Sequence, residues 1–492
     1  MRTKGIIIFL LICTIYGTTD VSGQQTKSSK RGVSYNIPYT DDLPTLTKGL
    51  SWFYNWGITP ATAISSTYDQ YLDYCPMAWN GVNASVLRTF KSAHPECQYI
   101  LAFNEPNLTN QANMTPTQAA AKWPDLKAIA TELNLKIISP AMNYGTLPGY
   151  SDPITWLDEF FTKVPLSDVD GIAIHCYMAN SASVASYVSR FEKYGKPIWL
   201  TEFCAWDGLT AATFTTDQQK DYMVETVTLL ENDPNVFRYA WFQGRNSSGE
   251  TAFPYYALLT AQKGVLTELG DIYTNMSSFD KNYYFSSQDT IQAEKFSNSH
   301  SASLRRMDAT SGNLYLNDFY FKDWAAYQVN LPENKLYTIT FKIACIDGTT
   351  LQILDSLGNL LQSQDIPNTG GLTSWGFRNI SVALPAGKQT IQLKSMGEGC
   401  NIDWFTFAPV NTAVQNVESS RVFSLYPNPM TDVLTIDTQE NTQDIKIFNP
   451  LGKLIYHGTN EKQINTADFS KGVYVVQLTF NDGTKLSGKI LK

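Results

Sequence analysis

The chain has 492 residues, of which 13% are aromatic and only 17% are charged, and its formal net charge is −8. This length predicts two to four domains with full-sized hydrophobic cores. The mildly acidic balance excludes the basic surface that binding to nucleic acid or to an anionic membrane needs, and it favours a neutral polymer as partner.

The first 23 residues are typical of a secretory signal. Arg2 and Lys4 precede an apolar run over residues 5–16, and two small residues follow at 22 and 23. Such a segment is too short for a membrane span, so we expect residues 1–23 to be removed and the protein to be secreted or held at the cell surface. We expect no lipid anchor at Cys13 and no later membrane span.

Six cysteines remain after this segment, an even number in an oxidising compartment. The sequence leaves their pairing open, with Cys176–Cys204 and Cys345–Cys400 as the two pairs considered. None of the cysteines has metal-ligand spacing and the chain has only four histidines, so we expect no zinc or copper centre.

Short apolar runs recur eight times in the first half of the chain, with amphipathic helical patterns between them. The runs are Gly32–Pro38, Leu50–Trp56, Tyr71–Trp79, Tyr99–Glu105, Leu135–Met142, Val169–Tyr177, Pro197–Phe203 and Phe237–Gly244. Eight alternations of strand and helix predict a closed (β/α)8 TIM barrel, which we place at residues 31–285. An open doubly wound sheet is the competing architecture, but no glycine-rich phosphate loop follows the first strand.

Two of these runs end in a glutamate. The fourth ends at Asn104 and Glu105, and the seventh ends at Glu202. Because the carboxyl ends of barrel strands share one face, the two carboxyl groups are expected to face each other, as retaining cleavage of a glycosidic bond requires at about 5–5.5 Å. The sequence predicts Glu105 as general acid and Glu202 as nucleophile, with no cofactor. An isolated strand-end glutamate is usually a surface residue, but the repeated aromatic context favours catalysis here.

Other strand ends supply candidate sugar-binding side chains. Burial and the charge of Glu202 are expected to hold the proton on Glu105, while hydrogen bonds from His175 or Tyr177 keep Glu202 ionised. Tryptophans are expected to stack on pyranose rings, although each could instead fill the barrel core. The candidates are Trp52, Tyr54, Trp56, Asn143, His175, Tyr177 and Trp241.

These residues carry a resemblance to known enzymes. Asn-Glu-Pro at 104–106 and Thr-Glu-Phe at 201–203 resemble clan A of the retaining glycoside hydrolases. Together with SWFYNWG at 51–57 and DGIAIHCY at 170–177, they resemble glycoside hydrolase family 128 over residues 31–274. The resemblance implies a secreted retaining endo-β-1,3-glucanase that acts on laminarin or curdlan, in which Asn104 bonds the sugar 2-hydroxyl.

Two alternatives remain open at this point. The chain could be another clan A endoglycanase that acts on β-mannan or β-1,4-glucan. It could also be a non-catalytic surface glycan-binding protein whose barrel has lost its activity, although the presence of both Glu105 and Glu202 argues against that.

Residues 286–409 have short alternating strands and no helical pattern, which predicts a β-sandwich. IQAEKF at 291–296 and NIDWFTF at 401–407 resemble a family 6 carbohydrate-binding module, and Leu372 departs from the tryptophan common at its position. The resemblance implies a jelly roll that binds structural calcium and a β-glucan. The calcium ligands would be Glu294 and Asp403, and the sugar site would use Tyr315, Trp375 and Asn401.

Residues 410–421 are polar, without periodicity, and predict a linker. Residues 422–492 contain YPNP at 426–429 and KGVYVVQL at 471–478, and they resemble the C-terminal sorting domain of type IX secretion. The resemblance implies a small immunoglobulin-like β-sandwich that is recognised by the type IX secretion machinery, and a plain spacer module is the alternative. We expect the protein to act as a monomer.

Overall fold

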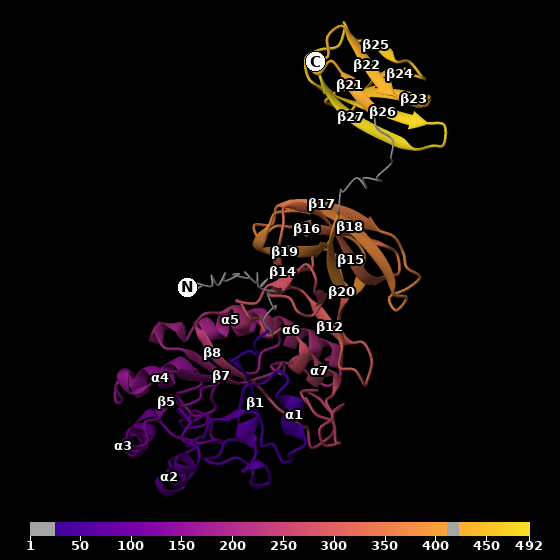
Figure 1. Ribbon diagram of the computed structural model, residues 1–492. Coiled ribbons are helices and arrows are strands. Elements are labelled where there is room, and N and C mark those ends of the chain that lie inside the picture. Colours follow the sequence, from indigo (N-terminus) through magenta and orange to yellow (C-terminus); the bar gives the residue numbers. More distant parts are fainter. Residues whose placement is uncertain (1–24, 411–422) are drawn as a thin grey trace, which may run out of the picture. The chain divides into compact units, whose positions relative to one another are not determined.

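The computed structural model describes residues 25–410 and 423–492 (Figure 1). They belong to two compact units, one up to Val410 and the other from Asn411 onwards. The expected signal at 1–23 lies outside the described residues, and so does the expected linker apart from Val410. Within the described ranges, no helix combines the length and the apolar character needed to cross a membrane.

Eight short parallel strands form the centre of the first unit. Six of them pair in the order β3-β2-β1-β8-β7-β6, and the other two pair as β4-β5. Single parallel bridges from Met77 to Leu101 and from Ile138 to Gly171 connect these two sheets, so the strands follow one another around a ring in chain order. The strands are β1 (Arg31–Ser34), β2 (Trp52–Tyr54), β3 (Asp73–Tyr74), β4 (Tyr99–Leu101), β5 (Lys136–Ile138), β6 (Ile172–Cys176), β7 (Ile198–Phe203) and β8 (Val236–Trp241).

Helices connect successive strands of the ring and lie outside it (Figure 1). α3 and α6 each begin with a complete capping box, at Thr115 with Gln118 and at Thr215 with Gln218, which satisfies the first free backbone N–H groups of each helix. The α-helices are α1 (Asp42–Leu46), α2 (Ala84–Ala93), α3 (Pro116–Glu132), α4 (Pro153–Phe161), α5 (Ser181–Ser189), α6 (Thr216–Asn232) and α7 (Glu268–Asn275). Short 3₁₀ turns are η1 (Thr62–Ile64), η2 (Tyr68–Gln70), η3 (Leu166–Asp168) and η4 (Glu192–Tyr194).

The interior of the ring is filled by large aromatic side chains. Trp52 and Trp199 meet edge to face, with ring centres 5.6 Å apart, and both are fully enclosed. Gly32 makes room for Trp52, because a Cβ atom at this position would lie 2.5 Å from the indole ring. The ring of strands is therefore a packed core, and only its two ends are open to a ligand.

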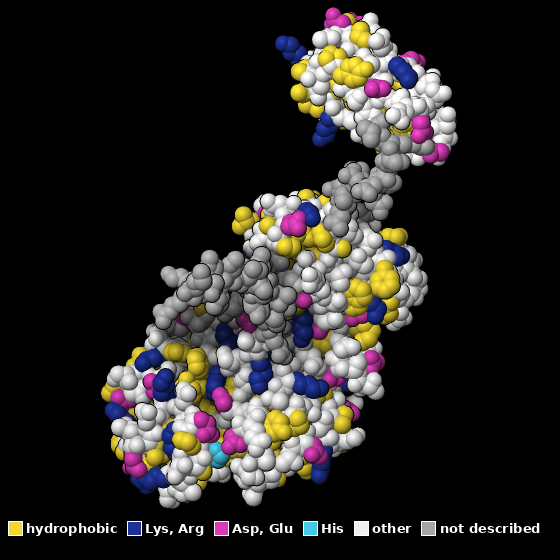
Figure 2. Space-filling view, viewed as in Figure 1, with side chains coloured by type: hydrophobic (Ala, Val, Ile, Leu, Met, Phe, Trp, Pro, Cys, Tyr) yellow, Lys and Arg dark blue, Asp and Glu magenta, His cyan; other side chains and the backbone are white. Residues whose placement is uncertain are grey.

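Residues 285–410, here called the second region, form two packed sheets that are antiparallel except for the parallel pair of β9 and β14. One has the order β12-β13-β20-β15-β18 with β10 beside β20, and the other has the order β11-β14-β19-β16-β17 with β9 beside β14. Figure 2 shows patches of hydrophobic side chains on the surface of this region. Its strands are β9 (Phe285–Ser286), β10 (Thr290–Gln292), β11 (Asn298–His300), β12 (Ser303–Arg306), β13 (Leu314–Phe319), β14 (Trp324–Leu331), β15 (Lys335–Cys345), β16 (Thr349–Leu354), β17 (Leu360–Ile366), β18 (Gly376–Leu384), β19 (Gly387–Ser395) and β20 (Cys400–Pro409).

Ion pairs fix the second region against the outer helices of the ring. Arg305 on β12 lies 2.8 Å from Asp221 on α6, and its neighbour Arg306 lies 2.9 Å from Asp271 on α7. The backbone N–H of Arg306 also donates to Glu268, at 2.9 Å. Both arginine side chains are largely buried, and their ion pairs join the two regions within one unit.

The second unit has its own small core. Its sheets have the orders β21-β22-β25 and β24-β23-β26-β27, and buried Leu434, Ile447 and Val476 pack between them. The strands are β21 (Phe423–Tyr426), β22 (Val433–Thr438), β23 (Thr442–Phe448), β24 (Leu454–Gly458), β25 (Gln463–Asn465), β26 (Val473–Phe480) and β27 (Lys485–Leu491).

All six cysteines in the described part of the chain are buried free thiols. Cys345 and Cys400 occupy opposite positions on β15 and β20, and the Cys400 thiol donates to Phe319 O at 3.8 Å. Cys176 on β6 stands opposite Phe203 on β7, so the register places Cys204 one residue beyond it.

We predict that the barrel depends on the second region for its stability. A chain ending at residue 285 loses the partners that Arg305 and Arg306 give to the carboxylates of α6 and α7, and it exposes the covered helix faces. Its melting temperature should be at least about 5 °C below that of a chain ending at Val410, measured by calorimetry. The full-length chain is the control: its first unit should melt with the chain that ends at Val410. Equal melting of the two truncated chains would contradict the prediction.

Candidate active site

A cleft of about 860 Å³ opens at the carboxyl ends of the ring strands. Glu105 and Glu202 both line it, together with the aromatic rings of Trp56, Trp206 and Phe242. Both carboxyl side chains are nearly buried, at 6% and 5% exposure, so the cleft presents two partly desolvated acids beneath aromatic walls.

Glu105 is held at the end of the segment that continues β4. Its backbone N–H donates to Ala141 at 3.0 Å, and Asn143 donates from Nδ2 to Glu105 Oε1 at 3.1 Å. Glu105 has a φ of +42°, a left-handed conformation that is strained for a residue with a Cβ atom. Such strain costs on the order of 1–3 kcal/mol and is typical of functional positions.

Glu202, on β7, accepts hydrogen bonds from three neutral donors. Tyr54 donates its hydroxyl to Oε1 at 3.0 Å and Trp56 donates its indole N–H to Oε1 at 2.7 Å. Tyr177 donates its hydroxyl to Oε2. Because these three groups donate, their hydrogen bonds favour the ionised form of Glu202.

His175, on β6, lies between the two glutamates. Its Nδ1 is 2.8 Å from Glu105 Oε1 and 3.4 Å from Glu202 Oε2, and its fully buried Nε2 has no partner among the described residues. The ligand atoms of the three side chains all lie within 4.8 Å of one another. No other trio of histidine, cysteine or acidic side chains in the described ranges clusters closely enough to hold a metal ion.

The charges of this trio influence one another strongly. Burial disfavours a positive His175, but both carboxylates outweigh burial and raise the pKa of His175. Burial also disfavours a charged Glu105, yet the charge and hydrogen bond of His175 hold the pKa of Glu105 below its ordinary value. Burial raises the pKa of Glu202, His175 opposes this rise, and the charge of Glu105 adds to it.

These directions of the two pKa shifts are opposite to the sequence expectation, in which burial and the charge of Glu202 hold the proton on Glu105 and hydrogen bonds keep Glu202 charged. The physical reason is the position of His175, whose ring lies closer to Glu105 than to Glu202. An imidazolium at 2.8 Å stabilises the ionised form of Glu105, while burial and the charge of Glu105 raise the pKa of Glu202.

The structure brings most of the predicted barrel residues together. Tyr54 and His175 lie buried beneath the cleft, and six further predicted residues line it. Asn104 donates from Nδ2 to Gln111 at 3.2 Å, while its buried Oδ1 has no partner among the described residues. The predicted residues that line the cleft are Trp56, Asn104, Glu105, Asn143, Tyr177 and Glu202.

Two predicted stacking residues do not reach the cleft. Trp52 lies at the start of β2 in the barrel interior, where its indole N–H donates to Lys30 O at 2.9 Å. Trp241 points out of the ring towards the helices and donates to Tyr256 O at 2.8 Å. Both side chains have no exposed surface, so neither can stack on a sugar, and the prediction is wrong for both.

Several residues that line the cleft are not among those predicted from the sequence. Phe242 lines the cleft in place of its neighbour Trp241, because successive strand residues point to opposite faces. Trp79 closes the third apolar run, and its place at a strand end could have identified it. Trp206 and Tyr144, which also line the cleft, lie in loops after β7 and β5, where periodicity gives no signal.

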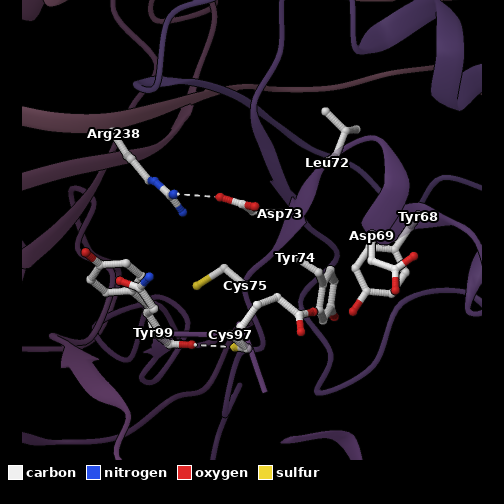
Figure 3. A pocket seen from close by; sticks show the side chains of 11 residues that line it. Tyr68, Asp69, Leu72, Asp73, Tyr74, Cys75, Cys97, Tyr99 and Arg238 are labelled. Carbon is white, nitrogen blue, oxygen red and sulfur yellow. Dashed lines mark hydrogen bonds and ion pairs between the residues drawn. The ribbon is translucent and has the colours of Figure 1, made fainter. Parts of the chain in front are cut away.

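A second cavity, of about 230 Å³, lies at the amino ends of the strands (Figure 3). Arg238 crosses it and pairs with Asp73 at 3.1 Å, and its guanidinium group lies 5.2 Å from the ring centre of Trp199. Cys97 donates its thiol to Tyr99 O at 3.5 Å. Arg238 therefore closes the lower end of the barrel core, on the side away from Glu105 and Glu202.

The predicted sugar site of the second region is only partly assembled. Tyr315 and Trp375 meet edge to face with ring centres 5.6 Å apart, and both are half-buried. Asn401 is 3% exposed; its Nδ2 donates to Leu372 O at 2.7 Å and its Oδ1 accepts from Asp318 N at 2.8 Å. Each end of this amide makes one hydrogen bond within the protein, so its second N–H and its remaining lone pair are what it can offer to a sugar, and its role as a sugar ligand stays a prediction.

The predicted calcium ligands lie close together and buried. Burial raises the pKa of Glu294 to about 7, and the charge of nearby Asp403 adds to the rise. Glu294 Oε2 is buried without a hydrogen-bond partner among the described residues. Asp403 Oδ2 pairs with Lys342 Nζ at 2.7 Å. An unpartnered buried carboxylate oxygen fits a hard cation such as calcium, with Glu294 as the better ligand of the two.

Family models match three parts of the chain. A glycosyl hydrolase catalytic core matches residues 32–273, a family 6 carbohydrate-binding module matches 292–409, and a secretion system C-terminal sorting domain matches 424–492. Among curated proteins, alkali-sensitive linkage protein 1 of Schizosaccharomyces pombe is 28% identical over 258 residues. That match covers 50% of this chain and only 44% of the yeast protein.

Solved structures similar to this chain include an endo-β-1,3-glucanase of glycoside hydrolase family 128, subgroup II, from Pseudomonas viridiflava. It is 40% identical, with 51% of this chain and 98% of that chain covered, and the TM-score is 0.46. A subgroup I endo-β-1,3-glucanase from Amycolatopsis mediterranei, solved as a mutant with laminaritriose and laminaribiose, is 28% identical with 50% and 98% covered and a TM-score of 0.41.

Proposed function

This chain belongs to glycoside hydrolase family 128, and from that premise we propose that it is a secreted retaining endo-β-1,3-glucanase. The observation that carries the proposal is the pair of nearly buried carboxyl groups, Glu105 and Glu202, whose closest oxygens lie within 4.8 Å. Retaining glycosidases hold their two carboxyl groups about 5–5.5 Å apart, whereas inverting enzymes need about 6.5–9.5 Å to admit a water molecule. The short separation supports retention.

The reaction proceeds in two displacements. In the first, Glu202 attacks the anomeric carbon while Glu105 gives its proton to the departing glycosidic oxygen, which leaves a glycosyl ester on Glu202. In the second, Glu105 takes a proton from water, the water oxygen bonds to the anomeric carbon, and Glu202 is released as a carboxylate. The donors Tyr54, Trp56 and Tyr177 hold the attacking carboxylate in place.

The proton that Glu105 needs is shared with His175. An imidazolium between two carboxylates and a neutral imidazole beside a protonated Glu105 contain the same number of protons. They differ only in the position of one proton along the 2.8 Å contact from Nδ1 to Oε1. A low pKa for Glu105 and a high pKa for His175 are therefore compatible with acid catalysis, because the proton is stored next to the group that delivers it.

The substrate is bound by the remaining cleft residues. The buried Oδ1 of Asn104 lacks a partner among the described residues, and this amide is proposed to bond the sugar 2-hydroxyl. Trp56, Trp79, Trp206 and Phe242 provide aromatic faces for the CH faces of a β-glucan chain. No cofactor takes part in the proposed reaction.

The domain assignment is proposed as follows. Residues 31–285 form the catalytic (β/α)8 barrel, 286–409 form a jelly-roll carbohydrate-binding module, and 422–492 form an immunoglobulin-like sorting domain after a linker at 410–421. The ring order of the eight strands supports the barrel, and the paired antiparallel sheets support the two sandwiches. With a signal at 1–23, the chain is exported as a monomer by type IX secretion to the cell surface or the medium.

Structural calcium is proposed for the binding module. Glu294 and Asp403 would hold the ion, and its charge would stabilise two carboxylates that are otherwise buried close together. Calcium has no part in the proposed hydrolysis.

We predict that Glu105→Gln and Glu202→Gln each lower kcat on laminarin by about 10³-fold or more without unfolding the protein. Each replacement keeps the shape of the side chain but removes its acid or nucleophile chemistry. Release of reducing ends measures the activity, and azide should restore turnover to Glu202→Ala with a product of inverted configuration. Substantial activity in Glu202→Gln would exclude the nucleophile assignment, and an inverted product from the unmodified enzyme would exclude retention.

The shared proton predicts the pH profile of kcat/KM. His175 has a raised pKa and so helps retain the catalytic proton at higher pH; His175→Gln should therefore move the alkaline limb to lower pH. Asn143→Ala is the matched control. It removes a donor to ionised Glu105, so the pKa of Glu105 rises and the alkaline limb should move to higher pH. A uniform loss of activity in His175→Gln, with an unmoved limb, would show that its role is only structural.

The buried Glu294 predicts a pH-dependent stability that calcium opposes. The folded-state pKa of Glu294 is raised to about 7, so the folded state holds this proton more tightly than the unfolded state does. The contribution of Glu294 to the free energy of unfolding of the first unit is therefore greatest below pH 4.5, and it falls by up to about 3 kcal/mol as the pH rises through 7. In EDTA, the melting temperature should fall between pH 5 and pH 8, and calcium should restore it. Both effects should vanish in Glu294→Gln. An equal response to calcium in that variant would refute the site.

A further inference from the structure

We propose that Asn107 is a positioning residue for the acid Glu105 and that it acts through Asn143. Asn107 lies two residues after Glu105, and it is fully buried outside the lining of the cleft, so it does not touch the substrate. The inference deepens the proposed function and rests on it, because the position of the acid matters only if Glu105 protonates the leaving oxygen.

Asn107 fastens the loop between β5 and α4 (Figure 1). Its side chain donates from Nδ2 to Asn143 O at 2.7 Å and to Tyr150 O at 3.3 Å. Its backbone carbonyl accepts from the N–H groups of Thr146 and Leu147, at 3.0 and 2.9 Å. One residue of the segment that carries Glu105 therefore holds the loop at four places.

The loop lies directly on Asn107 because residue 145 is a glycine. A Cβ atom at Gly145 would lie 2.4 Å from Asn107 O and 2.5 Å from Asn107 Nδ2. A neighbouring hydrogen bond joins Thr109 N to Thr146 Oγ1 at 2.9 Å. The two segments are thus packed backbone to backbone, with the amide of Asn107 between them.

The orientation of the Asn107 amide is set by the loop. Its Oδ1 is buried without a hydrogen-bond partner among the described residues, although buried polar groups are nearly always paired. Turning the amide over would point Oδ1 at two carbonyl oxygens, which can only accept. The observed orientation keeps two hydrogen bonds to the loop and leaves one acceptor unsatisfied.

The effect of Asn107 reaches Glu105 through the peptide group between Asn143 and Tyr144. Asn107 holds the carbonyl of this peptide group, and its N–H, on Tyr144, donates to Asn143 Oδ1 at 2.8 Å. The other end of the Asn143 amide, Nδ2, then points to Glu105 Oε1, at 3.1 Å. A fixed peptide plane therefore determines how Asn143 holds the acid.

The titratable groups near Glu105 come from other elements. They are His175 on β6, Glu202 on β7, and the hydroxyl groups of Tyr54, Tyr177 and Tyr187. Within the described residues, none of them is hydrogen-bonded to Asn107. A substitution at Asn107 therefore changes the surroundings of Glu105 by way of Asn143.

The test compares two leaving groups. Asn107→Ala should lower kcat/KM for a β-1,3-linked hexasaccharide by at least about tenfold, because a sugar hydroxyl departs only with a proton from a well-placed acid. For a β-1,3-linked glucose disaccharide with a 2,4-dinitrophenyl leaving group, which departs without a proton, the loss should be less than about threefold. A purely structural role would lower both values together.

The pH profile of kcat/KM gives a second readout. Asn143→Ala removes a donor to ionised Glu105, so the alkaline limb moves to higher pH. Asn107→Ala should move the limb in the same direction. The variant with both substitutions should have the profile of Asn143→Ala alone, because the two residues act in series.

Gln219→Ala is the matched control. Gln219 is also a fully buried amide that donates to two backbone carbonyls, Ala205 O at 3.0 Å and Pro254 O at 2.6 Å. It holds the loops after β7 and β8 and contacts neither Glu105 nor Asn143. Any loss of activity in this variant should be equal for the two substrates, and its alkaline limb should not move.

Equal losses on both substrates in Asn107→Ala, or an unmoved limb, would overturn the inference. Should this variant fold poorly, Asn107→Ser, which keeps a shorter donor, must still lose more activity on the hexasaccharide than on the dinitrophenyl substrate. Failure of the proposed function is read separately: the unmodified enzyme would cleave neither substrate, or Glu105→Gln would lose both activities equally, and the inference would fall with it.

Discussion

The structure depends on the stabilisation of two carboxyl groups that lie close together in a nearly dry cleft. Two negative charges at this separation repel each other, and burial disfavours both. This repulsion is offset by His175, which lies between Glu105 and Glu202, and by three neutral hydrogen-bond donors around Glu202. The same arrangement that makes the site stable also gives the two acids different surroundings, and this difference is what a double displacement requires.

The rest of the barrel serves to hold these groups at fixed positions. Trp52 and Trp199 fill the ring below the site, and Arg238 closes the lower end beneath them. This packing fixes β2, β6 and β7, which carry Tyr54, His175 and Glu202. The left-handed backbone at Glu105 and Trp56 is sustained by the same rigid surroundings, since strained residues persist only where neighbouring contacts determine their conformation.

The sequence was sufficient to predict the eight strand–helix alternations and the two glutamates, because these depend on local periodicity and on short motifs. It could not predict which strand residues face the cleft. In β8 the difference between Trp241 and Phe242 is one residue, and a strand of six residues has no sequence signal that fixes its orientation. The directions of the pKa shifts could not be predicted for a related reason: they depend on the 2.8 Å contact between His175 and Glu105, which come from separate segments of the chain.

In the second region, one hydrogen bond joins two segments of the motif that resembles a sugar-binding site. Asn401 and Leu372 stand in segments that resemble a sugar-binding edge, but in this chain they bind each other through an amide and a backbone carbonyl. Leucine cannot stack as the tryptophan common at this position does, and the amide of Asn401 holds the loop at Leu372. Aromatic rings of the same sheet pack on one another around Lys342, which pairs with Asp403. Arg305 and Arg306 fix this region to α6 and α7, so it keeps a constant position relative to the cleft.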